Sequence, residues 1–233
     1  MLEIVKPMDI EKRSFEIITE LLGDTPIPKE NELVVKRVIH TSADFDYAKN
    51  LVFSQDAVAK GIEALKKGCD IVTDTQMAKA GINKTILGKL GGQVHCFMSD
   101  PDVAMDAKER GITRAIVSME RAAALPKPCI FAIGNAPTAL ISIKEQMEKG
   151  LLHPALIIGV PVGFVNVVES KELIIESGLA PYIVARGRKG GSNVAAAICN
   201  AMLYQIMRNA RRRASICPDR DSGRFQSPGR SCS

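Results

Sequence analysis

Short runs of consecutive apolar residues recur five times between residues 70 and 185, and each is followed by a turn and a helical pattern. Runs that are apolar at every position, rather than at alternate positions, indicate strands buried on both faces, as in a parallel sheet covered by helices. The alternation predicts an α/β fold that is doubly wound, with a mainly parallel five-stranded sheet and helices on both faces. The predicted strands are 70–73, 93–97, 129–133, 155–160 and 182–185.

Helical patterns fill the spaces between these strands. Pro101 and Pro137 can each occupy a first helical position, where the missing N–H is harmless, and Gly111 and Gly178 lie where helices should stop. The first 68 residues differ, because they contain three helical patterns, which we expect to form an N-terminal helical layer packed on the same sheet. The predicted helices are 9–22, 31–41, 55–67, 85–90, 101–110, 113–124, 137–149, 164–177 and 193–207.

The charge of the chain is concentrated at its end. The net charge is +5, and residues 208–233 hold seven arginines and two aspartates, so residues 1–207 are neutral overall. We expect residues 1–207 to form a single α/β domain. Residues 208–233 are predicted to be a basic, disordered tail, or an extension that does not belong to the natural chain.

Composition excludes several classes of protein. Aromatic residues make up 4% of the chain and Trp is absent, which disfavours stacking on single-stranded nucleic acid. No apolar run reaches the ~18 residues of a membrane span. The first ten residues have no signal-peptide core, so we expect a cytosolic protein. The six cysteines have neither C-x-x-C spacing nor a histidine at zinc-site spacing, so we expect no metal site.

Three glycine-rich loops follow predicted strands. Ligands of open parallel sheets bind at the carboxyl ends of the strands, where these loops lie. Residues 186–192 combine three cations, three glycines and a helix N-terminus, which suits a carboxylate or a phosphate. The alternative is that such loops are simply tight turns. Neither a P-loop nor a G-x-G-x-x-G motif follows a strand, which argues against a nucleotide-dependent enzyme.

His40 stands at the end of an apolar helical pattern, with Arg37 one turn before it on the same face. A helix C-terminus favours the imidazolium and burial disfavours it, and a histidine that titrates near neutral pH can act as a general acid. The alternative is a histidine that only caps its helix. His95 is predicted to be a core residue of a strand, and His153 to be exposed in a turn.

Several strings together resemble the precorrin-8X methylmutase family of cobalamin biosynthesis, over residues 5–207. The resemblance is carried by R-V-I-H at 37–40, D-I-V-T-D at 70–74, A-I-G-N-A-P-T-A-L at 132–140, G-V-P-V-G-F-V at 159–165 with E-S-K at 169–171, and R-G-R-K-G-G-S at 186–192.

The resemblance implies an isomerase that moves a methyl group from C11 to C12 of the corrin precursor by a 1,5-sigmatropic shift. The substrate is precorrin-8X or cobalt-precorrin-8, the product is hydrogenobyrinate or cobyrinate, and no cofactor is needed. In the family a single histidine donates a proton to the macrocycle, and this role falls on His40. The resemblance also implies a homodimer with sites near the subunit interface.

Arginines are expected to bind the many carboxylates of such a substrate, because a guanidinium can bind a carboxylate through two hydrogen bonds. Asp74 is expected to have a structural hydrogen-bonding role. A non-catalytic tetrapyrrole-binding protein on the same fold is the alternative, and nucleic-acid binding is suggested only by the basic tail. The predicted substrate-binding residues are Ser14, Arg37, Arg114, Asn135, Arg186, Arg188 and Ser192.

Overall fold

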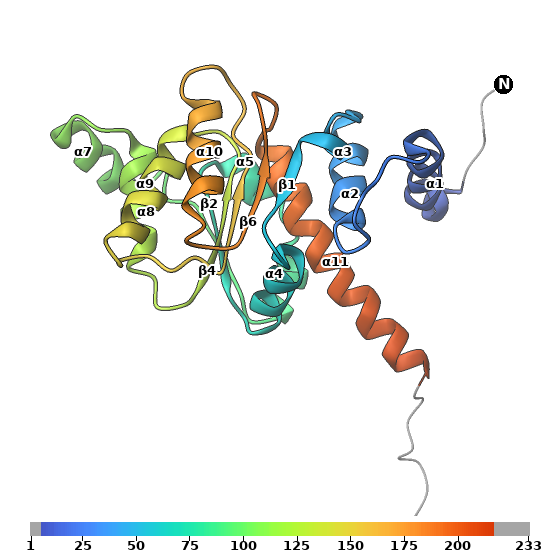
Figure 1. Ribbon diagram of the computed structural model, residues 1–233. Helices are drawn as coiled ribbons and strands as arrows, with labels where there is room; N and C mark the ends of the chain where they lie inside the picture. The colour runs from blue at the N-terminus through green and yellow to red at the C-terminus, as the bar shows by residue number, and fades with distance from the viewer. Residues whose placement is uncertain (1–5, 217–233) are drawn as a thin grey trace, which may run out of the picture.

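Parallel strands form the centre of the fold, as the apolar runs predicted (Figure 1). The computed structural model describes residues 6–216. The sheet has the strand order β1-β6-β5-β4-β2-β3, in which β1 pairs antiparallel with β6 and every other pairing is parallel. The strands are β1 (Leu51–Phe53), β2 (Asp70–Thr73), β3 (Val94–His95), β4 (Cys129–Ile133), β5 (Leu156–Gly159) and β6 (Tyr182–Ala185).

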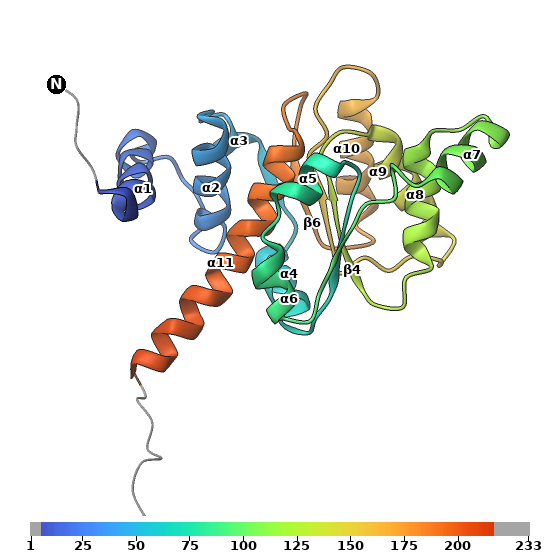
Figure 2. The same ribbon diagram turned by 180° about the vertical axis from the view of Figure 1, so that it is seen from behind.

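Helices pack on both faces of the sheet, and the predicted α/β class with a mainly parallel sheet is confirmed. Because side chains alternate along a strand, Ile130 and Ala132 of β4 enter one core while Phe131 and Ile133 enter the other. Figure 2 shows the face covered by α4 (Ala57–Lys66), α5 (Gln76–Gly81), α6 (Lys84–Lys89) and α11 (Ser192–Ile216). The other face carries α7 (Pro101–Arg110), α8 (Arg114–Ala123), α9 (Pro137–Glu148) and α10 (Val167–Ser177).

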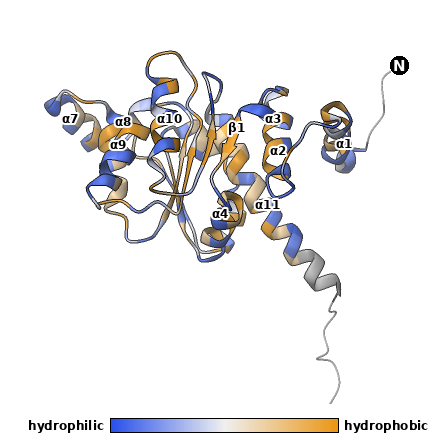
Figure 3. Ribbon diagram, viewed as in Figure 1, coloured by the Kyte–Doolittle hydropathy of each residue, from blue (hydrophilic) through white to orange (hydrophobic). Residues whose placement is uncertain are grey.

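Helix α11 connects the sheet to the N-terminal helices. Its small and apolar residues, among them Ala195, Ile198, Cys199 and Met202, are buried between the strands and the neighbouring helices. Helix α2 (Glu32–Ser42) packs mainly on α11, and α1 (Ile10–Leu22) packs on α2. Figure 3 shows the apolar sides of α2 and α11 turned toward each other, with α1 at the edge of the molecule.

The predicted N-terminal layer is therefore only partly correct. Of its three helices, α4 packs on β5 and β6, whereas α2 reaches the sheet through α11. The spacing of apolar residues along the sequence identified which face of each helix is buried. It did not identify whether that face packs on the sheet or on another helix. The start of the chain also includes a 3₁₀ turn at Pro7–Asp9 and the short helix α3 (Tyr47–Asn50).

The prediction of five strands was wrong, because β1 adds a sixth at the edge of the sheet. It is three residues long and depends on backbone pairing with β6, so no periodic pattern marks it. Helix α5 was also missed, although Thr75 caps it by accepting a hydrogen bond from the Ala78 N–H at 3.0 Å. Both elements are too short for a pattern to repeat.

Helix ends differ from the predictions by three residues or more at two places. Helix α10 begins at Val167 rather than 164, because Asn166 adopts a left-handed conformation with φ 55° that ends the preceding loop. Helix α11 continues past the predicted end at Met207 to Ile216, so the first part of the predicted tail is helical. The rest of that tail, residues 217–233, lies outside the described residues. Within residues 6–216, no helix is long and apolar enough to cross a membrane.

Leu156→Ala tests the importance of the core between β5 and helices α4 and α11. Leu156 is fully buried, so we expect its truncation to lower the free energy of unfolding by about 2–5 kcal/mol. Leu151→Ala is the matched control, because Leu151 is 60% exposed and its truncation should change stability by less than about 0.5 kcal/mol. Urea unfolding followed by circular dichroism measures both values. Equal losses in the two variants would contradict this account of the core.

Candidate active site

The three glycine-rich loops interlock at the carboxyl edge of the sheet. A Cβ atom on Gly134, after β4, would lie 2.7 Å from the Cα of Ser192 at the start of α11. A Cβ on Gly190 would collide with the carbonyl oxygen of Val160, after β5. Glycine is therefore required at both positions, because only a residue without a side chain allows such close approach of two backbones.

Asp74 holds one of these loops from the end of β2. Its buried carboxylate accepts hydrogen bonds from three consecutive amides, Gly134 at 2.9 Å, Asn135 at 2.8 Å and Ala136 at 2.6 Å. Burial raises the pKa of Asp74, and the three amide donors oppose that rise. The structural hydrogen-bonding role expected for Asp74 is confirmed.

The start of α11 is fixed to the end of β2 by two hydroxyl groups. Ser192 Oγ lies 2.7 Å from Thr75 Oγ1, which also caps α5. The neighbouring residue Thr73 donates from its hydroxyl to the carbonyl oxygens of Thr75 and His95. The predicted site residue Ser192 therefore lies where the loops after β2, β4 and β6 converge.

His40 lies in the last turn of α2 with its side chain exposed. Its ring stacks on Phe15 of α1, with 5.5 Å between centroids and 24° between planes. The guanidinium of Arg37 contacts the same Phe15 ring at 4.9 Å and the Tyr204 ring at 5.0 Å, which confirms that Arg37 and His40 share one helix face. Phe15 restricts the orientation of the imidazole from one side and leaves the rest of the ring accessible.

Arg37 is buried and already has a carboxylate partner. Its Nη2 donates to Glu11 Oε1 at 2.7 Å, and this hydrogen bond lowers the pKa of Glu11. His40 contributes to the same lowering, so the Glu11 carboxylate is close enough to interact with the imidazole electrostatically. The cluster therefore places one anion and one permanent cation beside the histidine.

Lys189 joins the loop after β6 to the segment that follows His40. Its Nζ lies 2.7 Å from Asp44 Oδ2 and 2.6 Å from Asp46 Oδ2. The hydrogen bond from Lys189 lowers the pKa of Asp44, and both aspartates raise the pKa of Lys189. This bridge brings the end of α2 and the loop at 186–192 to the same side of the molecule.

The remaining predicted residues have intramolecular partners of two kinds. Arg186 pairs with Glu172 at 3.2 Å, so its charge is compensated by a carboxylate. Arg188 donates to the carbonyl oxygen of Phe164 at 2.9 Å, and Arg114 donates to that of Met98 at 3.2 Å. Since a carbonyl carries no charge, and no carboxylate of residues 6–216 pairs with Arg188 or Arg114, these two guanidinium charges are not compensated within that part of the chain.

Ser14 and Asn135 complete the predicted set. Ser14 Oγ donates to the carbonyl oxygen of Ile10 within α1, and Asn135 is exposed in the loop that Asp74 holds. The structure thus forms two groups, one around His40 on α1 and α2, and one in the loops after β4 and β6. Arg114 stands apart at the start of α8, which is joined to the start of α9 by hydroxyls of Thr113 and Thr138 at 3.0 Å.

Several residues of these groups were not predicted from the sequence. No motif marks Phe15, Tyr204 or Glu11, because their contacts depend on how α1 and α11 pack around α2. Lys171 did carry a signal. It occupies the buried face of α10 together with Val167 and Ile174, at the helical spacing of a core residue.

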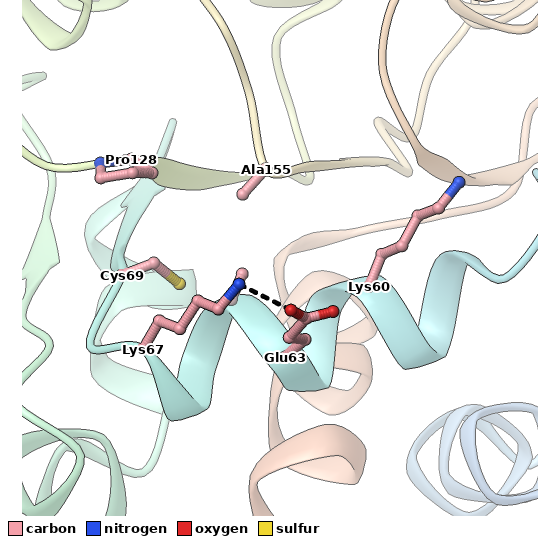
Figure 4. Close-up of a pocket in the computed structure, with 7 residues that line it drawn as sticks. Lys60, Glu63, Lys67, Cys69, Pro128 and Ala155 are labelled. Atoms are coloured by element: carbon pink, nitrogen blue, oxygen red, sulfur yellow. Dashed lines mark hydrogen bonds and ion pairs between the residues drawn. The ribbon is translucent and has the colours of Figure 1, made fainter.

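A cavity of about 290 Å³ lies at the opposite, amino edge of the sheet (Figure 4). It is lined by Cys69, Pro128 and Ala155, which precede strands β2, β4 and β5. Lys67 on its wall is paired with Glu63 at 2.6 Å, and burial raises the pKa of the Cys69 thiol to about 12. This cavity therefore has neither a reactive thiolate nor a connection to the loops around Ser192.

Residues 6–216 contain no group of three His, Cys, Asp or Glu side chains that could hold a metal ion. Cys69, Cys96, Cys129 and Cys199 are free and buried.

The structure is an α/β fold with a six-stranded, mostly parallel sheet, cationic and glycine-rich loops at its carboxyl edge, and an exposed histidine at the end of α2. The precorrin-8X methylmutase family model matches residues 9–205. The chain belongs to that family.

Individual relatives agree with this assignment. The cobalt-precorrin-8 methylmutase of Priestia megaterium is 46% identical over 198 residues, which cover 85% of this chain and 88% of the relative. The precorrin-8X methylmutase of Pseudomonas aeruginosa is 39% identical over 194 residues, covering 83% and 93%. The crystal structure of precorrin-8x methyl mutase from Thermus thermophilus superimposes with a TM-score of 0.78 at 35% identity, covering 86% of this chain and 98% of that one.

Asp74→Asn tests the role of the buried carboxylate. Both carboxylate oxygens of Asp74 accept hydrogen bonds from backbone amides, whereas an asparagine side chain has only one accepting oxygen. Its NH₂ group would replace the other oxygen and would face N–H donors without being able to accept from them. We expect the free energy of unfolding to fall by about 2–3 kcal/mol. Thermal and urea unfolding measure the loss, with the exposed Asp24→Asn as control. Unchanged stability of Asp74→Asn would contradict the role assigned to this carboxylate.

Proposed function

We propose that this chain catalyses the migration of a methyl group from C11 to C12 of precorrin-8X or of its cobalt complex. The reaction is an isomerisation in the biosynthesis of the corrin ring of cobalamin. Membership of the methylmutase family supports the activity. The observation that carries the assignment of the site is the exposed His40, which stacks on Phe15 and is followed by a segment that Lys189 joins to the glycine-rich loops.

In the proposed mechanism, the imidazolium of His40 donates a proton to the macrocycle. Protonation makes the conjugated system electron-poor, so that the methyl group migrates from C11 to C12 more easily. The proton returns to His40 when the product forms, so no atom is gained or lost. General acid catalysis of this kind supplies about 10²–10⁴-fold, and correct positioning of the macrocycle must supply the rest.

Binding of the substrate depends on its carboxylates. Arg188 and Arg114 are the strongest candidates, because their present partners are uncharged carbonyls. Arg37 and Arg186 already pair with carboxylates, so they would bind the substrate by sharing those partners or exchanging them. We propose that the hydroxyls of Ser14 and Ser192 and the Asn135 amide complete the binding surface.

We propose that the protein forms a homodimer and acts in the cytosol. Helix α1 supports the dimer, because Ile10, Ile17 and Leu21 are exposed while Ile18 and Leu22 pack inward. Phe164 and Val165, in the loop after β5, are also more than three-quarters exposed. A second copy of the chain would cover apolar side chains of this kind beside the site.

His40→Ala separates catalysis from binding. We expect the variant to lose most turnover, since no other histidine is placed among the predicted site residues, while it still binds the coloured product. The change in absorption on anaerobic incubation with precorrin-8X, and separately with cobalt-precorrin-8, measures turnover. His153→Ala is the control, because this histidine is exposed in a turn before β5. Wild-type turnover by His40→Ala would show that another group donates the proton, and binding without turnover by the wild type would favour a carrier.

Leu21→Glu tests the proposed dimer. A charge at this exposed position of α1 leaves the fold of one subunit intact, but it would be buried without a partner between two subunits. We expect sedimentation to show a dimer for the wild type and a monomer for the variant. Thr19→Glu is the control, since Thr19 is an exposed polar residue of the same helix. A monomeric wild type would contradict the proposal.

A further inference from the structure

Lys171 is a fully buried lysine in the core-facing side of α10. A buried ammonium costs far more than an apolar side chain of similar size, so stability alone does not favour lysine at this position. Among residues 6–216, Glu172 is the charged side chain that interacts electrostatically with Lys171. Glu172 is itself paired with Arg186.

The Lys171 ammonium binds the loop after β6 from inside. Its Nζ donates to the carbonyl oxygens of Gly187 at 2.8 Å and Lys189 at 2.9 Å. Both peptide bonds are trans, so the N–H of the following residue points away from the carbonyl. The amides of Arg188 and Gly190 are therefore turned away from the Lys171 ammonium, and within residues 6–216 neither donates a hydrogen bond to the protein.

Other contacts leave the loop little freedom once these carbonyls are fixed. Gly163 N–H donates to the carbonyl of Arg188 at 3.2 Å, and Gly191 N–H donates to that of Val160 at 2.9 Å. The ammonium of Lys189 points to Asp44 and Asp46, beyond His40. Lys171 is thus the inner support of a loop whose outer side presents one guanidinium and two amides.

We propose that Lys171 is a positioning residue for substrate binding: its ammonium turns the amides of Arg188 and Gly190 outward and adds a buried positive charge behind them, forming a seat for a substrate carboxylate. The role rests on the proposed function, because it gives the loop at 186–192 the task of binding carboxylates. It also explains why a charged residue, rather than an apolar one, stands on the buried face of α10.

Deprotonation of Lys171 should affect binding and stability in opposite directions. Burial lowers its pKa from 10.5 to about 8, against a smaller opposing effect of Glu172. Between about pH 8 and about pH 10.5 the unfolded chain holds the proton that the folded chain has lost, so this group adds stability as pH rises. The neutral amine, however, has lost the charge behind the carboxylate seat, so binding weakens over the same range.

The test is to measure the affinity of the chain for hydrogenobyrinate by absorption titration. Measurements at about pH 7 and about pH 9.5 lie on the two sides of the Lys171 pKa. We expect wild-type affinity to fall roughly 10-fold between the two conditions. Lys171→Met should bind hydrogenobyrinate roughly 10-fold more weakly than the wild type at the lower pH. Its kcat at saturating substrate should be unchanged. Its affinity should not show the fall between the two pH values that deprotonation of Lys171 causes in the wild type. Lys144→Met, which changes a partly exposed lysine of α9, should follow the wild type.

Equal affinity of Lys171→Met and the wild type at both pH values would overturn the role of Lys171 while leaving the methylmutase activity intact. If Lys171→Met does not fold, the pH dependence of the wild type tests the role of Lys171 by itself. A wild-type affinity for hydrogenobyrinate that stays constant, while the free energy of unfolding rises with pH, would also overturn that role. A wild type that binds neither hydrogenobyrinate nor cobyrinate and turns over neither precorrin-8X nor cobalt-precorrin-8 would overturn the proposed function together with this role.

Discussion

The carboxylate of Asp74 is the contact on which the site depends most directly. One buried side chain at the end of β2 satisfies three consecutive amides of the loop after β4, and without it those amides would lose these hydrogen bonds. With that loop fixed, Gly134 can lie against Ser192 without a gap. The position of α11, and of everything packed on it, therefore follows from the end of a neighbouring strand.

Local charge, rather than net charge, fits the protein to an anionic substrate. Residues 1–207 are neutral overall, and many surface cations are compensated by carboxylates, as Arg186 is by Glu172. Arg188 and Arg114 instead donate to backbone carbonyls, and Lys171 does the same from inside the core. Arg188 and Lys171 thus bring positive charge to the loop after β6 without an ion-pair partner among residues 6–216.

Sequence patterns predicted the parts of the fold that burial dictates. Continuous apolar runs identified β2, β4, β5 and β6, because strands covered on both faces have no polar side to interrupt them. Strand β1 depends on the exposed edge of β6, and α5 on a single cap, so neither leaves a repeating pattern. The motifs likewise indicated His40 and the loop at 186–192, whereas Phe15 and Tyr204 enter the site only through tertiary packing.

Helix α11 links the two groups of residues that the proposed mechanism assigns to one substrate. It begins at Ser192 among the loops, and twelve residues later its Tyr204 ring contacts Arg37 beside His40. At 1.5 Å per residue, these points are about 18 Å apart along a single helix that is buried on the sheet. A large macrocycle with charged side chains can be held by its carboxylates at one end of that span while the histidine meets its ring system near the other. Because a buried helix resists bending, the distance between carboxylate binding and proton transfer in the proposed mechanism would be set by the fold rather than by the loops.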